Sequence, residues 1–174
     1  MAELQPSKLI MRVRFPSSAP LLIATVRIVD IVELDQHSAD STVALWQQCG
    51  LTRPWNDPYA DFTRAVEGPS SAVLGTYDEG GALIGTAMVG VDGHRGWVYY
   101  VASSPERRGL GIGRELMAAA EHWVESRGMP KVHVMVRRSN TAVVGFYDSL
   151  GYEEQDTMVL GRRFDGSSGG AIGS

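Results

Sequence analysis

Residues 105–116 read Pro-Glu-Arg-Arg-Gly-Leu-Gly-Ile-Gly-Arg-Glu-Leu. A β-rich run, residues 97–102, leads into this stretch, and an amphipathic helical pattern leaves it. The glycines therefore lie at the start of a helix, where backbone N–H groups are unpaired and the helix dipole is positive. Because they have no Cβ atom, Gly109, Gly111 and Gly113 let an anion approach the backbone closely. The stretch predicts a strand, an anion-binding loop and a helix in succession.

Two arginines precede the glycines and favour phosphate as the anion. The guanidinium groups of Arg107 and Arg108 offer forked donors that match phosphate oxygens. The glycine spacing fits neither the G-x-x-x-x-G-K-[ST] loop of nucleotide triphosphatases nor the G-x-G-x-x-G loop of dinucleotide-binding folds. A strand-to-helix turn that needs flexible glycines is the alternative interpretation at this point.

The rest of the chain predicts a mixed α/β fold without internal repeats. Antiparallel hairpins stand beside one strand–helix–strand unit, and turn-forming residues separate the strands. In chain order, the sequence predicts a strand at 26–33, helices at 40–48 and 59–67, strands at 71–77, 83–91 and 96–102, a helix at 112–124, a strand at 131–136, a helix at 140–150, and a strand pair at 152–155 and 157–163.

Composition narrows the class of protein. The 174 residues suit one globular domain, and the net charge of −4 gives no sign of a basic nucleic-acid-binding face. The lone Cys49 cannot form an internal disulfide or a multi-cysteine metal site, and the four histidines show no metal-ligand spacing. No apolar run reaches the roughly 20 residues that cross a bilayer. We expect a cytoplasmic monomer or homodimer without a metal, nucleic-acid or membrane partner.

The two ends of the chain are expected to lie outside the fold. Residues 1–24 contain three prolines and show neither helical nor strand periodicity. They make a poor signal peptide, because the apolar run is short and does not follow the arginines directly. Residues 166–174 are rich in glycine and serine. We predict an unstructured extension at 1–24, one folded domain at 25–165 and a flexible tail at 166–174.

Two sequence blocks together resemble the GNAT superfamily of acetyl-CoA-dependent N-acetyltransferases. Residues 108–113 match the family's R/Q-x-x-G-x-G/A loop. Asn140, Tyr147 and the run Leu150-Gly151-Tyr152 are similar to its N-x(6)-Y-x-x-L-G-F/Y block. Residues 53–58 and 92–96 further resemble the YpeA-like bacterial acetyltransferases. The resemblance implies a GNAT-family acyltransferase whose central, mostly antiparallel sheet is flanked by helices.

The resemblance also implies where acetyl-CoA binds. The backbone N–H groups of the glycine loop would hold the pyrophosphate of coenzyme A, and the pantetheine arm would pair with the edge of the preceding strand. The family usually has an apolar residue where Ser103 stands, but a backbone contact tolerates this difference. The implied cofactor-binding residues are Val101, Ser103, Arg107, Arg108, Gly109, Leu110, Gly111, Ile112, Gly113 and Asn140.

The implied chemistry is attack of an amine on the thioester carbonyl. An amine with a pKa of about 10 must first lose its proton, because an ammonium cannot attack. The family motif places Tyr147 to protonate the departing thiolate and the backbone N–H of Val101 to meet the oxyanion. Packing beside Phe146 is the alternative role for Tyr147.

The general base is left open by the sequence. Residues 97–102 contain no carboxylate, although family members often have a glutamate there. The candidates are His94, Asp92, Asp57 and Tyr99. His94 lies in a polar turn, where a solvated residue with no catalytic role is the alternative interpretation.

The acceptor is expected to be a primary amine of a small molecule or a protein. Trp55, Asn56 and Asp57 lie in the helical region that covers the acceptor in this family. Asp57 could bind a cationic amine or cap the following helix, and Trp55 could simply cover the core. A non-catalytic acyl-CoA-binding or sensor domain on the same fold is the alternative function, and a nucleotide-binding protein is a third.

Overall fold

The computed structural model describes residues 30–137 and 139–164. The chain divides into two compact units, of which one ends at Met135 and the other begins at Val136. The extension predicted at 1–24, the tail predicted at 166–174 and the start of the strand expected at 26–33 lie outside the described residues. None of the described helices is long and apolar enough to cross a membrane.

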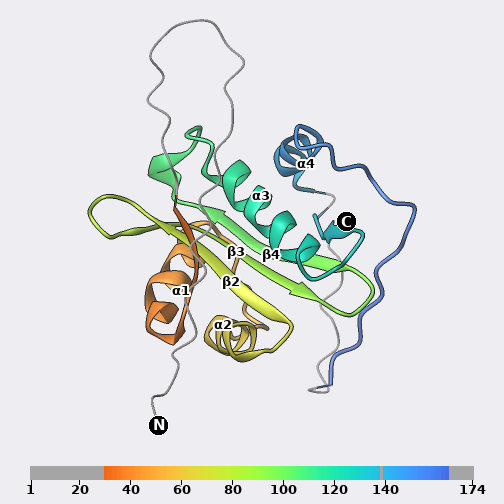
Figure 1. The fold of residues 1–174 in the computed structure, drawn as a ribbon, viewed down its shortest axis with the longest axis horizontal. Coiled ribbons are helices and arrows are strands. Elements are labelled where there is room, and N and C mark those ends of the chain that lie inside the picture. Colours follow the sequence, from red (N-terminus) through yellow and green to blue (C-terminus); the bar gives the residue numbers. More distant parts are fainter. Residues whose placement is uncertain (1–29, 138, 165–174) are drawn as a thin grey trace, which may run out of the picture. The chain divides into compact units, whose positions relative to one another are not determined.

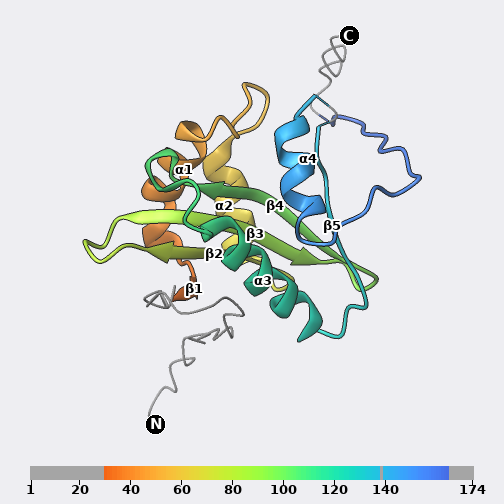
Figure 2. The same ribbon diagram turned by 90° about the horizontal axis from the view of Figure 1, so that it is seen from above.

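Five strands of the first unit form one sheet, in the order β1-β2-β3-β4-β5 (Figures 1 and 2). Neighbours from β1 to β4 are antiparallel, and β5 is parallel to β4. The strands are β1 (Ile31–Glu33), β2 (Ser71–Tyr77), β3 (Leu83–Val91), β4 (Gly96–Ser103) and β5 (Val132–Val134). The predicted mixed α/β fold with a mostly antiparallel sheet is therefore confirmed.

Helices cover both faces of this sheet (Figure 2). The helices α1 (Ala39–Gln48) and α2 (Pro58–Glu67) pack on one face, and α3 (Ile112–Glu125) packs on the other. Successive strand residues point to opposite faces, so neighbours in β3 face different helices. Gly85 faces α3, whereas Thr86 accepts a hydrogen bond from Trp46 of α1.

Two glycines in the strands allow α3 to pack closely against the sheet. A Cβ atom at Gly85 would lie 2.6 Å from Cγ2 of Ile112, at the start of α3. A Cβ atom at Gly96 would lie 2.3 Å from Cγ1 of Val124, near the end of the helix. Since such distances are far shorter than normal carbon–carbon contacts, both positions need glycine for packing. The close approach fixes where the first turn of α3 meets the strands.

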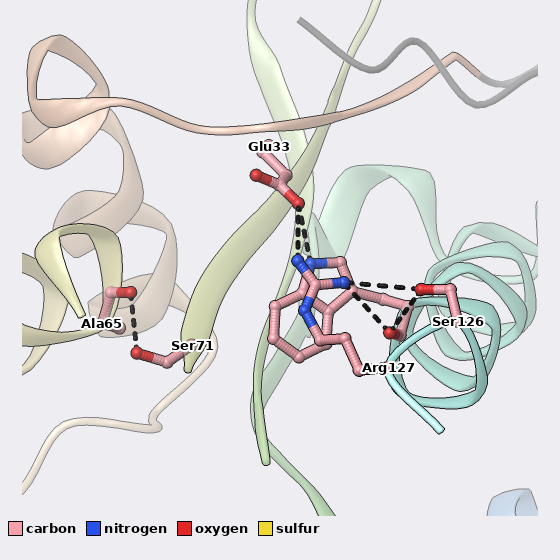
Figure 3. A network of polar contacts seen from close by, with 6 residues as sticks. Glu33, Ala65, Ser71, Ser126 and Arg127 are labelled. Carbon is pink, nitrogen blue, oxygen red and sulfur yellow. Dashed lines mark hydrogen bonds and ion pairs between the residues drawn. The ribbon is translucent and has the colours of Figure 1, made fainter. Parts of the chain in front are cut away.

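Polar contacts also tie the far end of α3 to β1 (Figure 3). Glu33 Oε1 accepts a hydrogen bond from the indole N–H of Trp123 at 2.7 Å. The guanidinium group of Arg127 lies 3.3 Å from the centre of the Trp123 ring and 3.9 Å from Glu33. This network anchors the C-terminal end of α3 through groups of the chain itself.

The predicted strand pair at 152–155 and 157–163 is wrong for this structure. The second unit contains α4 (Thr141–Asp148), and residues 152–163 form no strand. A short-range bond, from Thr157 N–H to the Gln155 carbonyl at 2.8 Å, lies within the segment. Residues 158–160, Met-Val-Leu, form a short apolar run, but such a run does not specify the neighbouring strand that the backbone of a strand needs as a partner.

Candidate functional site

The glycine loop joins β4 to α3 and holds a backbone conformation that suits glycine. Gly109 and Gly111 have φ angles of 77° and 81°, in the left-handed region that strains residues with a Cβ atom. Gly111 is the N-cap residue of α3 and makes no side-chain capping bond. A Cβ atom at either glycine would meet no atom within 4 Å. Backbone conformation therefore requires these glycines, and the space beside them is open to a ligand.

The start of α3 offers hydrogen-bond donors to that space. The first N–H groups of a helix have no acceptor inside it, and the helix dipole makes this end positive. Arg108 is exposed beside the loop. The guanidinium group of Arg107 instead donates to Asp78 Oδ2 at 3.1 Å, in the turn between β2 and β3. The donors and the positive charge fit a bound diphosphate, with Arg108 better placed than Arg107 to supply the side-chain cation.

The strand that leads into the loop is paired unequally along its length. β4 pairs with β5 over three residue pairs, from Gly96↔Val132 to Val98↔Val134, and then continues to Ser103. Within the described residues, no strand continues this pairing beside residues 99–103. An unpaired strand edge can form backbone hydrogen bonds with an extended ligand. Val101 and Ser103, the two residues predicted to contact the pantetheine arm, both lie in this half of β4.

A β-bulge interrupts β4 in the same half. Met88 pairs with Tyr99 and Thr86 pairs with Ala102, so Tyr100 and Val101 together stand opposite one residue of β3. Tyr100 has a φ of 48°, and it is the only residue other than glycine with a positive φ in the described chain. Such a conformation costs on the order of 1–2 kcal/mol and is maintained by surrounding contacts.

The side chain of Tyr100 is held by two helices on the α1–α2 face. Its ring stacks on Trp46 with 4.1 Å between ring centres, and its hydroxyl donates to Asp61 Oδ2 at 2.8 Å. Burial, reinforced by the Asp61 hydrogen bond, raises the pKa of Tyr100 to about 12. Asp61 also forms an ion pair with the exposed Arg64. The sequence analysis missed Asp61, because its spacing in α2 gives no sign of a contact with β4.

The three residues predicted to contact the acceptor precede α2. Asp57 Oδ1 accepts hydrogen bonds from the N–H groups of Tyr59 at 2.9 Å and Ala60 at 3.2 Å. The capping interpretation of Asp57 is therefore confirmed, and its contact with an amine stays a prediction. Trp55 is 53% exposed and Asn56 is also exposed, so neither is required to cover the core.

The turn before β4 contains two of the candidate bases. Asp92 accepts hydrogen bonds from the N–H of His94 at 2.8 Å and from the indole N–H of Trp97 at 2.9 Å. The Trp97 bond, with two backbone N–H groups, lowers the pKa of Asp92 to about 2 and makes it a weak base. The glycine loop follows the other end of β4, at a distance of roughly 3.3 Å per strand residue. This placement gives no support to His94 or Asp92 as the general base.

The second unit contains the other two predicted site residues. Asn140 is the N-cap residue of α4 and makes no side-chain capping bond. Tyr147 is only 8% exposed and contacts the rings of Phe146 and Tyr152 edge-on. Burial raises the pKa of Tyr147 to about 12. The phenol is therefore protonated at any physiological pH, whether it serves packing or catalysis.

Comparison with known proteins agrees with this architecture. Residues 31–152 match the acetyltransferase (GNAT) family. The chain is 40% identical over 135 residues to acetyltransferase YE1169 of Yersinia enterocolitica. The matched residues cover 78% of this chain and 95% of that protein. It is 41% identical over 128 residues to acetyltransferase ECA0875 of Pectobacterium atrosepticum, covering 74% of this chain and 90% of that protein.

A solved structure shares the fold at lower sequence identity. The aminoglycoside N-acetyltransferase AAC(6')-Iy in complex with CoA has a TM-score of 0.68 and 20% identity, covering 82% of this chain and 99% of that one. The same enzyme with a bisubstrate analogue, CoA-S-monomethyl-acetylneamine, also has a TM-score of 0.68, with 19% identity and coverage of 78% and 97%.

Fold, glycine loop and sequence relatives define one class of protein. The chain belongs to the acetyltransferase (GNAT) family. It is accordingly an acetyltransferase that uses acetyl-CoA as the acetyl donor.

Proposed function

We propose that the protein transfers the acetyl group of acetyl-CoA to a primary amine of a small molecule or a protein, by direct attack on the thioester. One observation carries this proposal: the open edge of β4 leads, through the loop of residues 104–111, into the N-terminal end of α3. Acetyl-CoA joins an amide-containing arm to a diphosphate. The strand edge suits the arm and the helix start suits the diphosphate, in the same order along the chain.

The backbone supplies most of the binding groups in this proposal. N–H groups from Gly109 to Gly113 bind the pyrophosphate, with Arg108 beside them. Val101 and Ser103 pair with the pantetheine arm, and Asn140 contributes an amide hydrogen bond. The N–H of Val101 also stabilises the oxyanion that forms when the amine attacks the carbonyl.

Tyr147 is proposed to assist the departure of the sulfur atom. As the new C–N bond forms and the C–S bond breaks, negative charge develops on sulfur. The phenol has a pKa of about 12, whereas a thiol has a pKa of about 8.5, so Tyr147 stabilises the thiolate mainly by donating a hydrogen bond. Support for this role comes from the spacing between Asn140 and Tyr147 and from the protonated state of the phenol.

Asp61 is proposed to attract the acceptor as an ammonium ion. Its carboxylate is bonded to Tyr100 in the open half of β4. The Arg64 side chain in its ion pair is 69% exposed, and pairs with a solvent-exposed cation contribute little, about 0–1 kcal/mol, so an incoming ammonium can replace the arginine. Water then accepts the proton that the amine must lose before it attacks. In this proposal water replaces His94 as the general base. Trp55, Asn56 and Asp57 stay as proposed contacts of the acceptor.

The finer identity of the protein belongs to the same proposal. Residues 53–58 and 92–96 resemble segments of the YpeA-like bacterial acetyltransferases, and we place the chain in that subgroup, as a cytoplasmic enzyme.

Two measurements on the intact protein test the proposed function. Calorimetric titration should show binding of CoA and acetyl-CoA, and much weaker binding of ATP, which lacks the pantetheine arm. Mass spectrometry of reactions with acetyl-CoA and a panel of amines and peptides should then find an acetylated product. CoA binding without any product across the panel would favour the sensor function, and equal affinity for ATP would contradict the acetyl-CoA site.

A further inference from the structure

A buried hydrogen-bond relay ends on the bulged residue of β4. The indole N–H of Trp46 donates to Thr86 Oγ1 at 3.0 Å, and Thr86 Oγ1 donates to the backbone carbonyl of Tyr100 at 3.3 Å. Trp46 and Thr86 are both 0% exposed. Water cannot replace either bond, so the Thr86 hydroxyl is both the acceptor for α1 and the donor for β4.

The relay is specific to this one buried threonine. Thr76 on β2 is equally buried, and its hydroxyl has no hydrogen-bond partner. Gly85, the neighbour of Thr86 in β3, pairs with Thr76 across the two strands. The two threonines therefore occupy nearby positions of one sheet, but only the hydroxyl of Thr86 contacts the bulge.

We propose that Thr86 is a positioning residue that holds the β4 bulge in the conformation needed to bind acetyl-CoA. The proposal rests on the proposed function, in which Val101 and Ser103 contact the acyl donor. Tyr100 is fixed at both ends: the relay holds its carbonyl, and Asp61 holds its hydroxyl. These contacts keep a tyrosine in a left-handed conformation that it would otherwise leave for an extended one.

Loss of the bulge would alter the binding edge directly. A bulge inserts one extra residue, so its removal shifts the following residues by one position in register. A shift of one residue turns every side chain and backbone group after it to the opposite direction. Val101 and Ser103 would then no longer present to a ligand the backbone groups that they present in the bulged strand.

Thr86→Val tests this role, with two matched variants. Valine keeps the shape of threonine and removes the hydroxyl. Calorimetric titration with CoA should give a dissociation constant at least fivefold higher, and amide hydrogen exchange in residues 99–103 should be at least tenfold faster. Thr86→Ser restores the hydroxyl and should return both values to within about twofold of the unmodified protein. Thr76→Val removes a hydroxyl that bonds to nothing and should change neither value.

The outcomes separate this role from a general effect on stability. Unchanged exchange and affinity in Thr86→Val would overturn the proposal, as would equal changes in Thr76→Val or no recovery in Thr86→Ser. If Thr86→Val does not fold, Tyr100→Phe cuts the other attachment of the same residue and should raise exchange in residues 99–103; no rise would overturn the proposal. If the unmodified protein does not bind CoA, the proposed function fails, and the exchange measurements still test the relay.

Discussion

A glycine in the left-handed conformation flanks each end of α3, but the two ends differ in how the chain caps them. Gly111 before the helix and Gly128 after it have φ angles of 81° and 77°, and a Cβ atom at either would meet nothing within 4 Å. After the helix, Ser126 and Gly128 donate backbone N–H groups to the His122 and Glu125 carbonyls. The side chains of Ser126 and Arg127 donate to the Trp123 carbonyl.

Within the described residues, the N-terminal end lacks a side-chain capping bond from its N-cap residue. Gly111 brings no side-chain cap, although serine, threonine, asparagine or aspartate at this position would satisfy one of the free N–H groups. The chain uses such a cap elsewhere, at Asp57 before α2. One end of α3 is thus completed by the protein, and the other offers its donors to a ligand. A left-handed glycine alone does not show whether a helix end is capped by the protein or available to a ligand. The hydrogen bonds of the neighbouring backbone groups do.

The largest expected change is a fall in kcat on substitution of Tyr147, which lies at neither end of α3. Tyr147→Phe should lower kcat by roughly 10²-fold, because removal of one hydrogen-bond donor to developing negative charge costs about 10²- to 10³-fold, and should leave the dissociation constant of acetyl-CoA nearly unchanged. The measurement uses an acceptor found in the amine panel. Because the pKa of Tyr147 is raised to about 12, the phenol stays protonated and kcat should show no decline due to this group below about pH 11.

Tyr152→Phe is the matched control for Tyr147→Phe. Tyr152 contacts the Tyr147 ring edge-on, and removal of its hydroxyl should change kcat by less than about twofold. If Tyr147→Phe is equally silent, Tyr147 is a packing residue and another group assists the leaving thiolate.

The close packing of α3 against the sheet should contribute to the free energy of unfolding. Gly96→Ala places a Cβ atom against Val124, and the resulting overpacking should lower the free energy of unfolding by about 1–3 kcal/mol. Urea unfolding followed by circular dichroism measures the change. Gly145→Ala makes the same substitution in α4, where no atom lies within 4 Å, and should stabilise the protein by about 0.5–1 kcal/mol. A stabilised Gly96→Ala variant would show that the helix does not need this close approach.

A smaller effect is expected at the closed end of α3. Arg127→Met keeps most of the aliphatic side chain but removes the hydrogen bond to the Trp123 carbonyl and the cation over the Trp123 ring. The free energy of unfolding should fall by about 1 kcal/mol, and the affinity for acetyl-CoA should not change. Reduced affinity at unchanged stability would mean that this end also takes part in binding.

Much of the fold followed from local patterns in the sequence. The helix after the glycine loop and the hairpins around 78–81 and 92–95 were predicted because apolar spacing and turn residues act over short distances. The last two strands were predicted wrongly, since the short apolar run at 158–160 carries no information about a pairing partner. The strand expected at 131–136 is shorter, Val132–Val134, and this shortening leaves half of β4 open.

The candidate site was only partly predictable for a related reason. The glycine loop is contiguous in sequence, so its residue types and spacing could be read directly. The bulge at Tyr100 lies in an ordinary β-rich run, and its conformation depends on Trp46, Thr86 and Asp61, which come from three other elements. Contacts between distant segments leave no periodic signal, so a relay of this kind becomes visible only in three dimensions.

The central claim is that the open end of α3 binds the diphosphate of acetyl-CoA. Calorimetric titration of Gly111→Ala and Gly128→Ala with acetyl-CoA tests it most directly, because both variants place the same methyl group at a left-handed glycine of the same helix. The account predicts at least tenfold weaker binding for Gly111→Ala and an affinity within about twofold of the unmodified protein for Gly128→Ala, with similar losses of stability. Equal affinities in the two variants would contradict the assignment of the pyrophosphate to the glycine loop.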